Sequence, residues 1–117
     1  MKKYIYRIKN KSYKINVTDE TVSVTPHTFM KNGKLWERAS LNYFFSLIDN
    51  TELNVVDVGA QSGLYTLFSK YLPKTQFYAF EPFPKSYELL NNNIELNEIF
   101  NVKTYNLGVS DLSLIHI

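Results

Sequence analysis

The sequence predicts an α/β fold, a parallel sheet preceded by a small antiparallel β-hairpin or meander. Two observations carry this prediction. From residue 53 onward, short apolar runs alternate with longer segments whose apolar residues recur at helical spacing. Before residue 27, apolar and polar residues alternate with a period of two, which is typical of half-buried strands. The chain should therefore contain a β-rich extension followed by a strand–helix repeat.

The β-rich extension covers residues 1–32. Apolar side chains alternate along residues 4–8 and again along residues 13–17, and Asn10 and Lys11 punctuate the two runs. A third short run at residues 21–25 is ended by Pro26, because proline cannot continue a strand ladder. These runs predict a hairpin, or a meander if the third run joins the other two.

A helix is predicted after residue 33, in the stretch KLWERASLNYFFSLI, and Asp49 and Asn50 end it. Its expected apolar face consists of Trp36, Ser40, Tyr43, Phe44, Leu47 and Ile48.

The order βαβαβ follows. Residues 53–58, 76–81 and 102–107 read as buried strands, whereas residues 62–72 and 84–97 read as helices. Short turns between such elements imply a parallel sheet with helices packed on its faces.

The composition of the chain limits the classes of function that can be expected. The chain has 117 residues, 44% of them hydrophobic, which is enough for one small domain with a modest core. A net charge of +2 with scattered Lys and Arg gives no basic stripe, so no nucleic-acid partner is expected. The chain has no cysteine, no apolar signal region and no run long enough to span a membrane, which together predict a soluble, cytoplasmic protein.

The remaining polar residues predict no further site. His27 and His116 are isolated, so no metal site is expected. The run at residues 91–93, together with Asn97, reads as a polar helix face exposed to solvent.

A glycine-rich turn and an acidic residue form the predicted ligand-binding site. The segment DVGAQSG connects the first parallel strand to its helix, and Glu81 ends the next strand. Ligands of such sheets bind beyond the carboxyl ends of the strands, where amide N–H groups of the first helical turn are free. An acid at the position of Glu81 is placed to accept both hydroxyls of an adenosine ribose. A packing turn and a solvated strand end are the alternatives for each feature taken alone.

The turn does not match two common nucleotide motifs. The dinucleotide fingerprint G-x-G-x-x-G fails at Gln61, and Leu64 stands where a phosphate loop has lysine. Asp57, two residues before Gly59, would repel a pyrophosphate but would attract a cation. The charges favour S-adenosylmethionine (SAM), which carries an ammonium and a sulfonium group. An NAD-type oxidoreductase domain remains as a less favoured alternative.

The segments VVDVGAQSGLYT, FYAFEPFPKSYELLNNNIELN and NVKTYNLGVSD resemble the first half of the FkbM-type SAM-dependent methyltransferases. The resemblance covers residues 36–111, and Gln61 departs from the asparagine usual in the family's turn. It implies a class I, Rossmann-like methyltransferase fold and methyl transfer to a hydroxyl of a sugar or another metabolite. It also implies a SAM site in which Gly59, Ala60, Gln61 and Gly63 hold the methionine part, Asp57 the amino group, Glu81 the ribose, and Pro82, Phe83, Val109 and Ser110 the adenine.

The resemblance also predicts an incomplete domain. Residues 33–111 correspond to the N-terminal half of a methyltransferase domain, so the sheet is expected to stop after its third strand. Residues 112–117, LSLIHI, resemble translated sequencing adaptor and are expected to be an artefactual tail. No catalytic base is predicted within the chain. The enzyme activity is thus expected of the family, while the 117 residues alone are expected to be inactive, at most a weakly SAM-binding half-domain.

Overall fold

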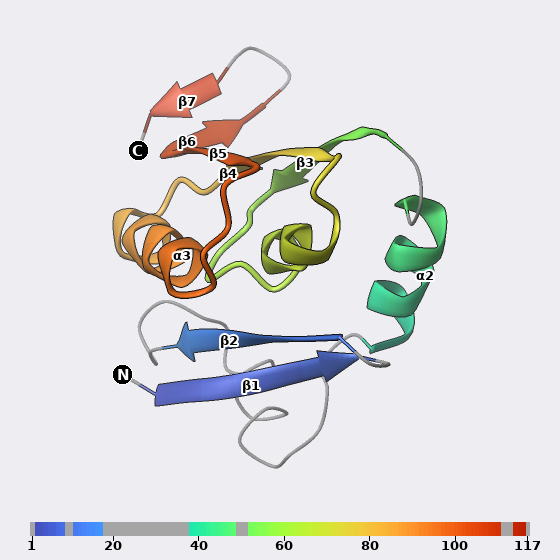
Figure 1. Cartoon of the computed structure of the whole chain (residues 1–117). Coiled ribbons are helices and arrows are strands. Elements are labelled where there is room, and N and C mark those ends of the chain that lie inside the picture. The colour runs from blue at the N-terminus through green and yellow to red at the C-terminus, as the bar shows by residue number, and fades with distance from the viewer. Residues whose placement is uncertain (1, 9–10, 18–37, 49–51, 111–113, 117) are drawn as a thin grey trace.

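A computed structural model describes residues 2–8, 11–17, 38–48, 52–110 and 114–116. Figure 1 shows three layers, with a parallel sheet above, helical segments in the middle and an antiparallel hairpin below. The predicted strand at residues 21–25, His27 and Trp36 lie outside the described residues.

The parallel sheet consists of β3 (Asn54–Val58), β4 (Gln76–Phe80) and β5 (Val102–Tyr105) in the order β3-β4-β5. The register pairs Val58 with Phe80 and Phe80 with Tyr105, so the three strands end at one edge. The predicted parallel sheet is confirmed. The segments that follow β3 and β4 both lie on the same side of the sheet (Figure 1), and not on its two faces.

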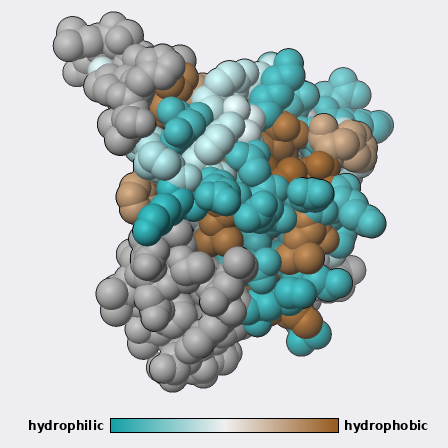
Figure 2. All heavy atoms as spheres, turned by 90° about the vertical axis from the view of Figure 1, so that its left-hand side faces the viewer, coloured by the Kyte–Doolittle hydropathy of each residue, from teal (hydrophilic) through white to brown (hydrophobic). Residues whose placement is uncertain are grey.

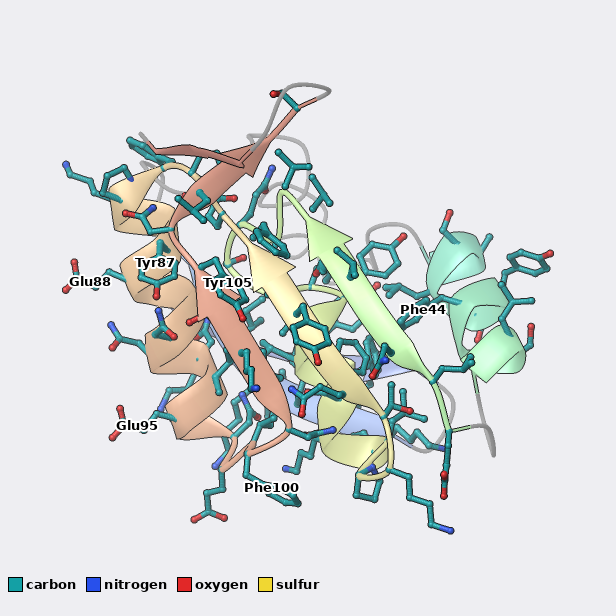
Figure 3. All side chains as sticks on the ribbon, turned by 90° about the horizontal axis from the view of Figure 1, so that it is seen from above. Phe44, Tyr87, Glu88, Glu95, Phe100 and Tyr105 are labelled. Carbon is teal, nitrogen blue, oxygen red and sulfur yellow. The ribbon has the colours of Figure 1, made fainter. Side chains whose placement is uncertain are left out.

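The two faces of the sheet differ in burial. Phe77 and Ala79 point into the layer of helical segments and are fully buried. On the opposite face Val56 is 60% and Val58 59% exposed. Figure 3 looks onto this outer face, where the ring of Tyr105 stacks on that of Phe80 with 4.8 Å between centroids.

The predicted N-terminal hairpin is present as β1 (Lys2–Ile8) and β2 (Lys11–Val17), which pair antiparallel. Tyr6 lies opposite Tyr13 in the register, and both rings are buried and stacked on each other. Both meet the ring of Phe68 edge-on. The hairpin therefore covers the helical layer on the side away from the sheet (Figure 1).

Helix α2 (Arg38–Ile48) confirms a helix in this region, but its buried face differs from the prediction. Tyr43 and Leu47 are exposed, whereas Leu41 is fully buried. Phe44 projects from α2 toward β3 and meets the rings of Tyr65 and Phe77 edge-on (Figure 3). Because α2 lies beside the sheet edge (Figure 1), it buries only a narrow stripe and not the whole apolar face.

The prediction of one helix over residues 62–72 is wrong in the type and the extent of the helix. The structure has turns over residues 61–65 followed by a 3-10 helix, η1 (Thr66–Tyr71). In an α-helix, the carbonyl of Ser62 would accept the N–H of Thr66. Here that carbonyl accepts the Asn93 side-chain amide instead (2.8 Å), and the N–H of Thr66 bonds to Asp57. The helical hydrogen-bond pattern is therefore interrupted at Ser62, although the N–H of Leu67 still bonds to the Gly63 carbonyl at α-helical spacing.

Helix α3 (Pro84–Leu96) begins with proline in its first turn, as predicted. Its outward side carries the exposed residues Glu88 and Glu95 (Figure 3). Figure 2 shows that hydrophilic side chains predominate on this side of the molecule, with hydrophobic ones only in small separate groups.

The predicted polar face at residues 91–93 and Asn97 is wrong for two of its members. Asn93 is fully inaccessible to solvent, and Asn97 is buried. Asn93 accepts the N–H of Asn16 through Oδ1 (2.8 Å) and donates to its carbonyl (3.0 Å). Asn97 makes the same two bonds to Lys14, at 2.9 and 2.6 Å. Two side-chain amides, one helical turn apart, thus dock the backbone edge of β2 onto α3.

The last predicted strand, residues 102–107, divides at Asn106. β5 ends at Tyr105, and β6 (Leu107–Val109) pairs antiparallel with β7 (Leu114–His116).

Among the described residues, no helix is long and apolar enough to cross a membrane.

The end of α3 offers a stability test away from the sheet edge. Glu98 has a φ of 56°, its N–H donates to the Glu95 carbonyl, and the N–H of Ile99 donates to Ile94. This is a Schellman motif with glutamate where glycine is usual. We expect Glu98→Gly to stabilise the fold by about 1 kcal/mol, because the left-handed conformation strains residues with a Cβ atom. Thermal melting should show a gain that Glu98→Ala does not give, and equal melting of both variants would contradict the expectation.

Candidate functional site

The glycine turn is tied to the end of the neighbouring strand. Gly59 and Ala60 both donate their N–H groups to the Phe80 carbonyl, at 2.8 and 3.1 Å. Gly59 and Gln61 have φ angles of 74° and 51°, so the chain turns sharply at the end of β3. The N–H groups of Gly59 and Ala60 are therefore used within the protein and are not free to bind a ligand.

Gly63 brings the turn close to α3. Its φ is 107°, and a Cβ atom there would lie 3.0 Å from Leu90 Cδ1 and 3.1 Å from Leu67 Cγ. Ala60 packs beside Ala79 and Leu90 in the same small cluster. A residue with a Cβ atom at position 63 would be both strained and crowded, whereas a Cβ atom on Gly59 would meet nothing within 4 Å.

Glu81 lies between the turn and the start of α3. Its side chain is 4% exposed, and its two carboxylate oxygens accept the N–H groups of Gln61 and Phe83, each at 2.8 Å. Asn106, at the end of β5, donates to the carbonyls of Glu81 and Pro82 at 2.9 and 3.0 Å. One buried carboxylate thus joins the glycine turn to the loop that follows β4. The sequence analysis missed Asn106, because it lies within the strand predicted over residues 102–107, whereas β5 ends at Tyr105.

Asp57, the second acid, lies near the end of β3. Thr66 donates to it from its hydroxyl, 2.6 Å from Oδ2, and from its backbone N–H. Burial raises the pKa of Asp57 above its usual range, and the charge of Glu81 raises it further, while the bonds from Thr66 act in the opposite direction. Thr66 was also missed, because nothing local distinguishes it from an ordinary helical threonine.

The geometry determines what this edge of the sheet can bind. Three consecutive N–H groups, those of Gly59, Ala60 and Gln61, are used within the protein. Phosphate sites of glycine turns depend on such N–H groups pointing at the ligand. With Asp57 and Glu81 at the ends of neighbouring strands, the edge offers acceptors instead. It suits a ligand that brings a cation and hydroxyl groups.

The other predicted site residues lie at different distances from this centre. Pro82 and Phe83 follow Glu81 directly, and the Phe83 side chain is 45% exposed. Val109 ends β6, beyond the bend at Asn106, and both it and Ser110 are exposed. The structure therefore brings together Asp57, Gly59, Ala60, Gln61, Gly63, Glu81, Pro82 and Phe83, and places Val109 and Ser110 on a separate element. In the described part of the chain, no three His, Cys, Asp or Glu residues are grouped to hold a metal ion.

Curated proteins with similar sequences are methyltransferases. The chain is 40% identical over 58 residues to methyltransferase sdnD of Sordaria araneosa, matching 48% of this chain and 22% of that protein. It is 33% identical over 79 residues to ribosomal RNA small subunit methyltransferase G of Malacoplasma penetrans, matching 67% of this chain and 33% of that protein. The chain thus spans about a third or less of the length of these relatives. No protein-family model matches it.

Solved structures agree on the fold. TYW2 of P. horikoshii, crystallised with MeSAdo, matches with a TM-score of 0.59 at 21% identity, over 91% of this chain and 36% of that chain. TYW2 of M. jannaschii, crystallised with AdoMet, matches with a TM-score of 0.55 at 27% identity, over 87% of this chain and 42% of that chain. The expected class I methyltransferase fold is therefore confirmed for the parallel sheet.

Proposed function

We propose that this chain forms the cofactor-binding part of a SAM-dependent methyltransferase. The observation that carries the proposal is the pair of acids, Asp57 and Glu81, at adjacent strand ends around a turn whose amides are already used. Carboxylates attract the ammonium and sulfonium groups of SAM and accept the hydroxyls of its ribose, whereas they repel the pyrophosphate of NAD. The similarity to methyltransferases, and the AdoMet bound to a protein of the same fold, support this choice.

Each residue has a role in the proposal. Gly59, Ala60, Gln61 and Gly63 shape the turn along the methionine part, and Asp57 binds the amino group. Glu81 accepts the ribose hydroxyls, and this needs no change in its existing bonds, because each carboxylate oxygen accepts more than one hydrogen. The half-exposed ring of Phe83, together with Pro82, borders the adenine. Val109 and Ser110 form the far border of the adenine.

The methyl acceptor in our proposal is a hydroxyl group of a sugar or another metabolite, as the resemblance to the FkbM-type family implies. One relative is a ribosomal RNA methyltransferase, so RNA is the competing acceptor class. The catalytic base is assigned to no residue of this chain. The alternative to an enzyme is a half-domain that binds SAM weakly and transfers nothing.

Calorimetry tests the cofactor directly. We expect S-adenosylhomocysteine and SAM to bind the purified chain with one site each, and NAD to give no heat at the same concentrations. NAD binding without a response to S-adenosylhomocysteine would support the oxidoreductase alternative and overturn the proposal. Binding of neither ligand, in a chain that melts cooperatively, would also contradict it.

A further inference from the structure

Two side chains that contact the backbone just after the glycine turn come from other layers. The hydroxyl of Tyr13, on β2, donates to the Leu64 carbonyl at 2.6 Å. The amide of Asn93, on α3, donates to the Ser62 carbonyl at 2.8 Å. Both side chains are fully buried, and Asn93 is also one of the two amides that dock the hairpin.

We propose that Tyr13 and Asn93 are positioning residues for Asp57, and that the N-terminal hairpin is therefore a working part of the candidate site. An α-helix through this segment would pair the Ser62 carbonyl with the N–H of Thr66. In the structure the Ser62 carbonyl bonds to the Asn93 amide, and the N–H of Thr66 bonds to the Asp57 carboxylate in place of its helical partner. Tyr13 bonds to the Leu64 carbonyl, whose α-helical partner would be the N–H of Phe68, and that N–H bonds to the Tyr65 carbonyl instead.

Removing either positioning residue should change the ionisation of Asp57 more than it changes the fold. When the bonds to the Ser62 and Leu64 carbonyls are removed, the backbone of this segment can adopt α-helical hydrogen bonding. Asp57 then loses the N–H of Thr66 as a hydrogen-bond donor. A carboxylate that loses a hydrogen-bond donor is harder to ionise. Besides burial, the groups that act on the pKa of Asp57 are the hydroxyl and N–H of Thr66 and the carboxylate of Glu81, and the buried phenol of Tyr13 interacts with Asp57 electrostatically. Asp57 should therefore titrate at higher pH when either positioning residue is removed.

Two matched pairs of variants separate positioning from docking. Asn97 docks β2 with the same two bonds as Asn93, but its bonds go to Lys14 and to the Asn93 carbonyl and not to Ser62. Tyr71 links its hydroxyl to the backbone of Ser12, so it holds the hairpin without contacting the turn. Asn93→Ala is therefore compared with Asn97→Ala, and Tyr13→Phe with Tyr71→Phe.

The first measurement is the titration of the Asp57 carboxyl by NMR in the ligand-free protein, which does not depend on the proposed function. We expect Asn93→Ala and Tyr13→Phe to shift this titration upward, while Asn97→Ala and Tyr71→Phe lower the melting temperature without moving it. Tyr13→Phe keeps the ring and its stacking, so it tests the proposal even if Asn93→Ala does not fold. Equal shifts within each pair, or no shift in Tyr13→Phe, would overturn the proposal.

The second measurement rests on the proposed function. At pH 7 we expect the Kd for S-adenosylhomocysteine to rise about tenfold in Asn93→Ala and Tyr13→Phe, since one lost hydrogen bond to a charged group is worth about that much. The two control variants should bind like the wild type. A wild-type chain that does not bind the ligand contradicts the proposed function alone, whereas binding that all four variants weaken equally contradicts the positioning role alone.

Discussion

Glu81→Gln is expected to weaken S-adenosylhomocysteine binding about 100-fold, because bonds to charged groups are the strong ones in such sites. The carboxylate of Glu81 accepts two backbone N–H groups, one from Gln61 and one from Phe83. Glutamine has the same shape but offers only one oxygen, so its amide group would face one of those N–H donors. The substitution is thus expected to remove the proposed ribose acceptor and to open the turn at the same time. Calorimetry at constant pH measures the change in Kd.

Glu88→Gln is the matched control for this variant. Glu88 lies exposed on the outer side of α3 (Figure 3), so the substitution removes the same charge without touching the site. Its Kd should equal that of the wild type. Unchanged binding in Glu81→Gln, or an equal loss in both variants, would show that Glu81 does not bind the ligand.

Periodicity was sufficient to predict the framework of the fold. β3, β4, β5 and α3 begin and end within two residues of their predicted bounds, because alternating burial and helical spacing are local properties of the sequence. Residues 62–72 have equally helical spacing, and the side chains of Leu67, Phe68 and Leu72 are buried as expected, whereas those of Leu64 and Tyr71 are only partly buried. Their backbone differs because its hydrogen-bond partners, Asn93 and Tyr13, lie 31 and 51 residues away. A local pattern carries no information about such partners.

The two acids of the candidate site could be predicted from the sequence, whereas their hydrogen-bond partners could not. Asp57 and Glu81 were placed together because the carboxyl ends of adjacent parallel strands share one edge of the sheet. Their partners Thr66 and Asn106 could not be inferred, since each bond depends on how a turn closes. Asn93 was assigned to solvent because asparagine on a helix is usually exposed, and the β2 edge that buries it is 77 residues away in sequence.

Asp57→Asn should change stability and affinity in opposite directions. Burial raises the pKa of Asp57 in the folded protein above its value in the unfolded chain, so the folded state holds the proton more tightly. Stability is then greatest at low pH and falls as pH rises through the window between the unfolded and the folded pKa. At neutral pH the ionised group therefore opposes folding. We expect Asp57→Asn to raise the melting temperature of the ligand-free protein at pH 7 and to remove this part of its pH dependence.

Ligand affinity should depend on the charge of Asp57 in the opposite way, because the ionised group should strengthen binding. The ammonium group of the ligand favours the ionised form of Asp57, so wild-type affinity is expected to fall as pH is lowered through the raised pKa of Asp57. In this range the wild type should release protons on binding, which calorimetry detects as a heat that varies with the ionisation enthalpy of the buffer. Asp57→Asn should bind about tenfold more weakly at pH 7, the effect of one pKa unit of lost interaction, and without proton release. A variant that binds as tightly as the wild type, or that keeps its pH dependence, would place the cation of the ligand elsewhere. We therefore expect the acid before the glycine turn to make the ligand-free protein less stable and ligand binding tighter, which is the pattern of a group kept for binding and not for folding.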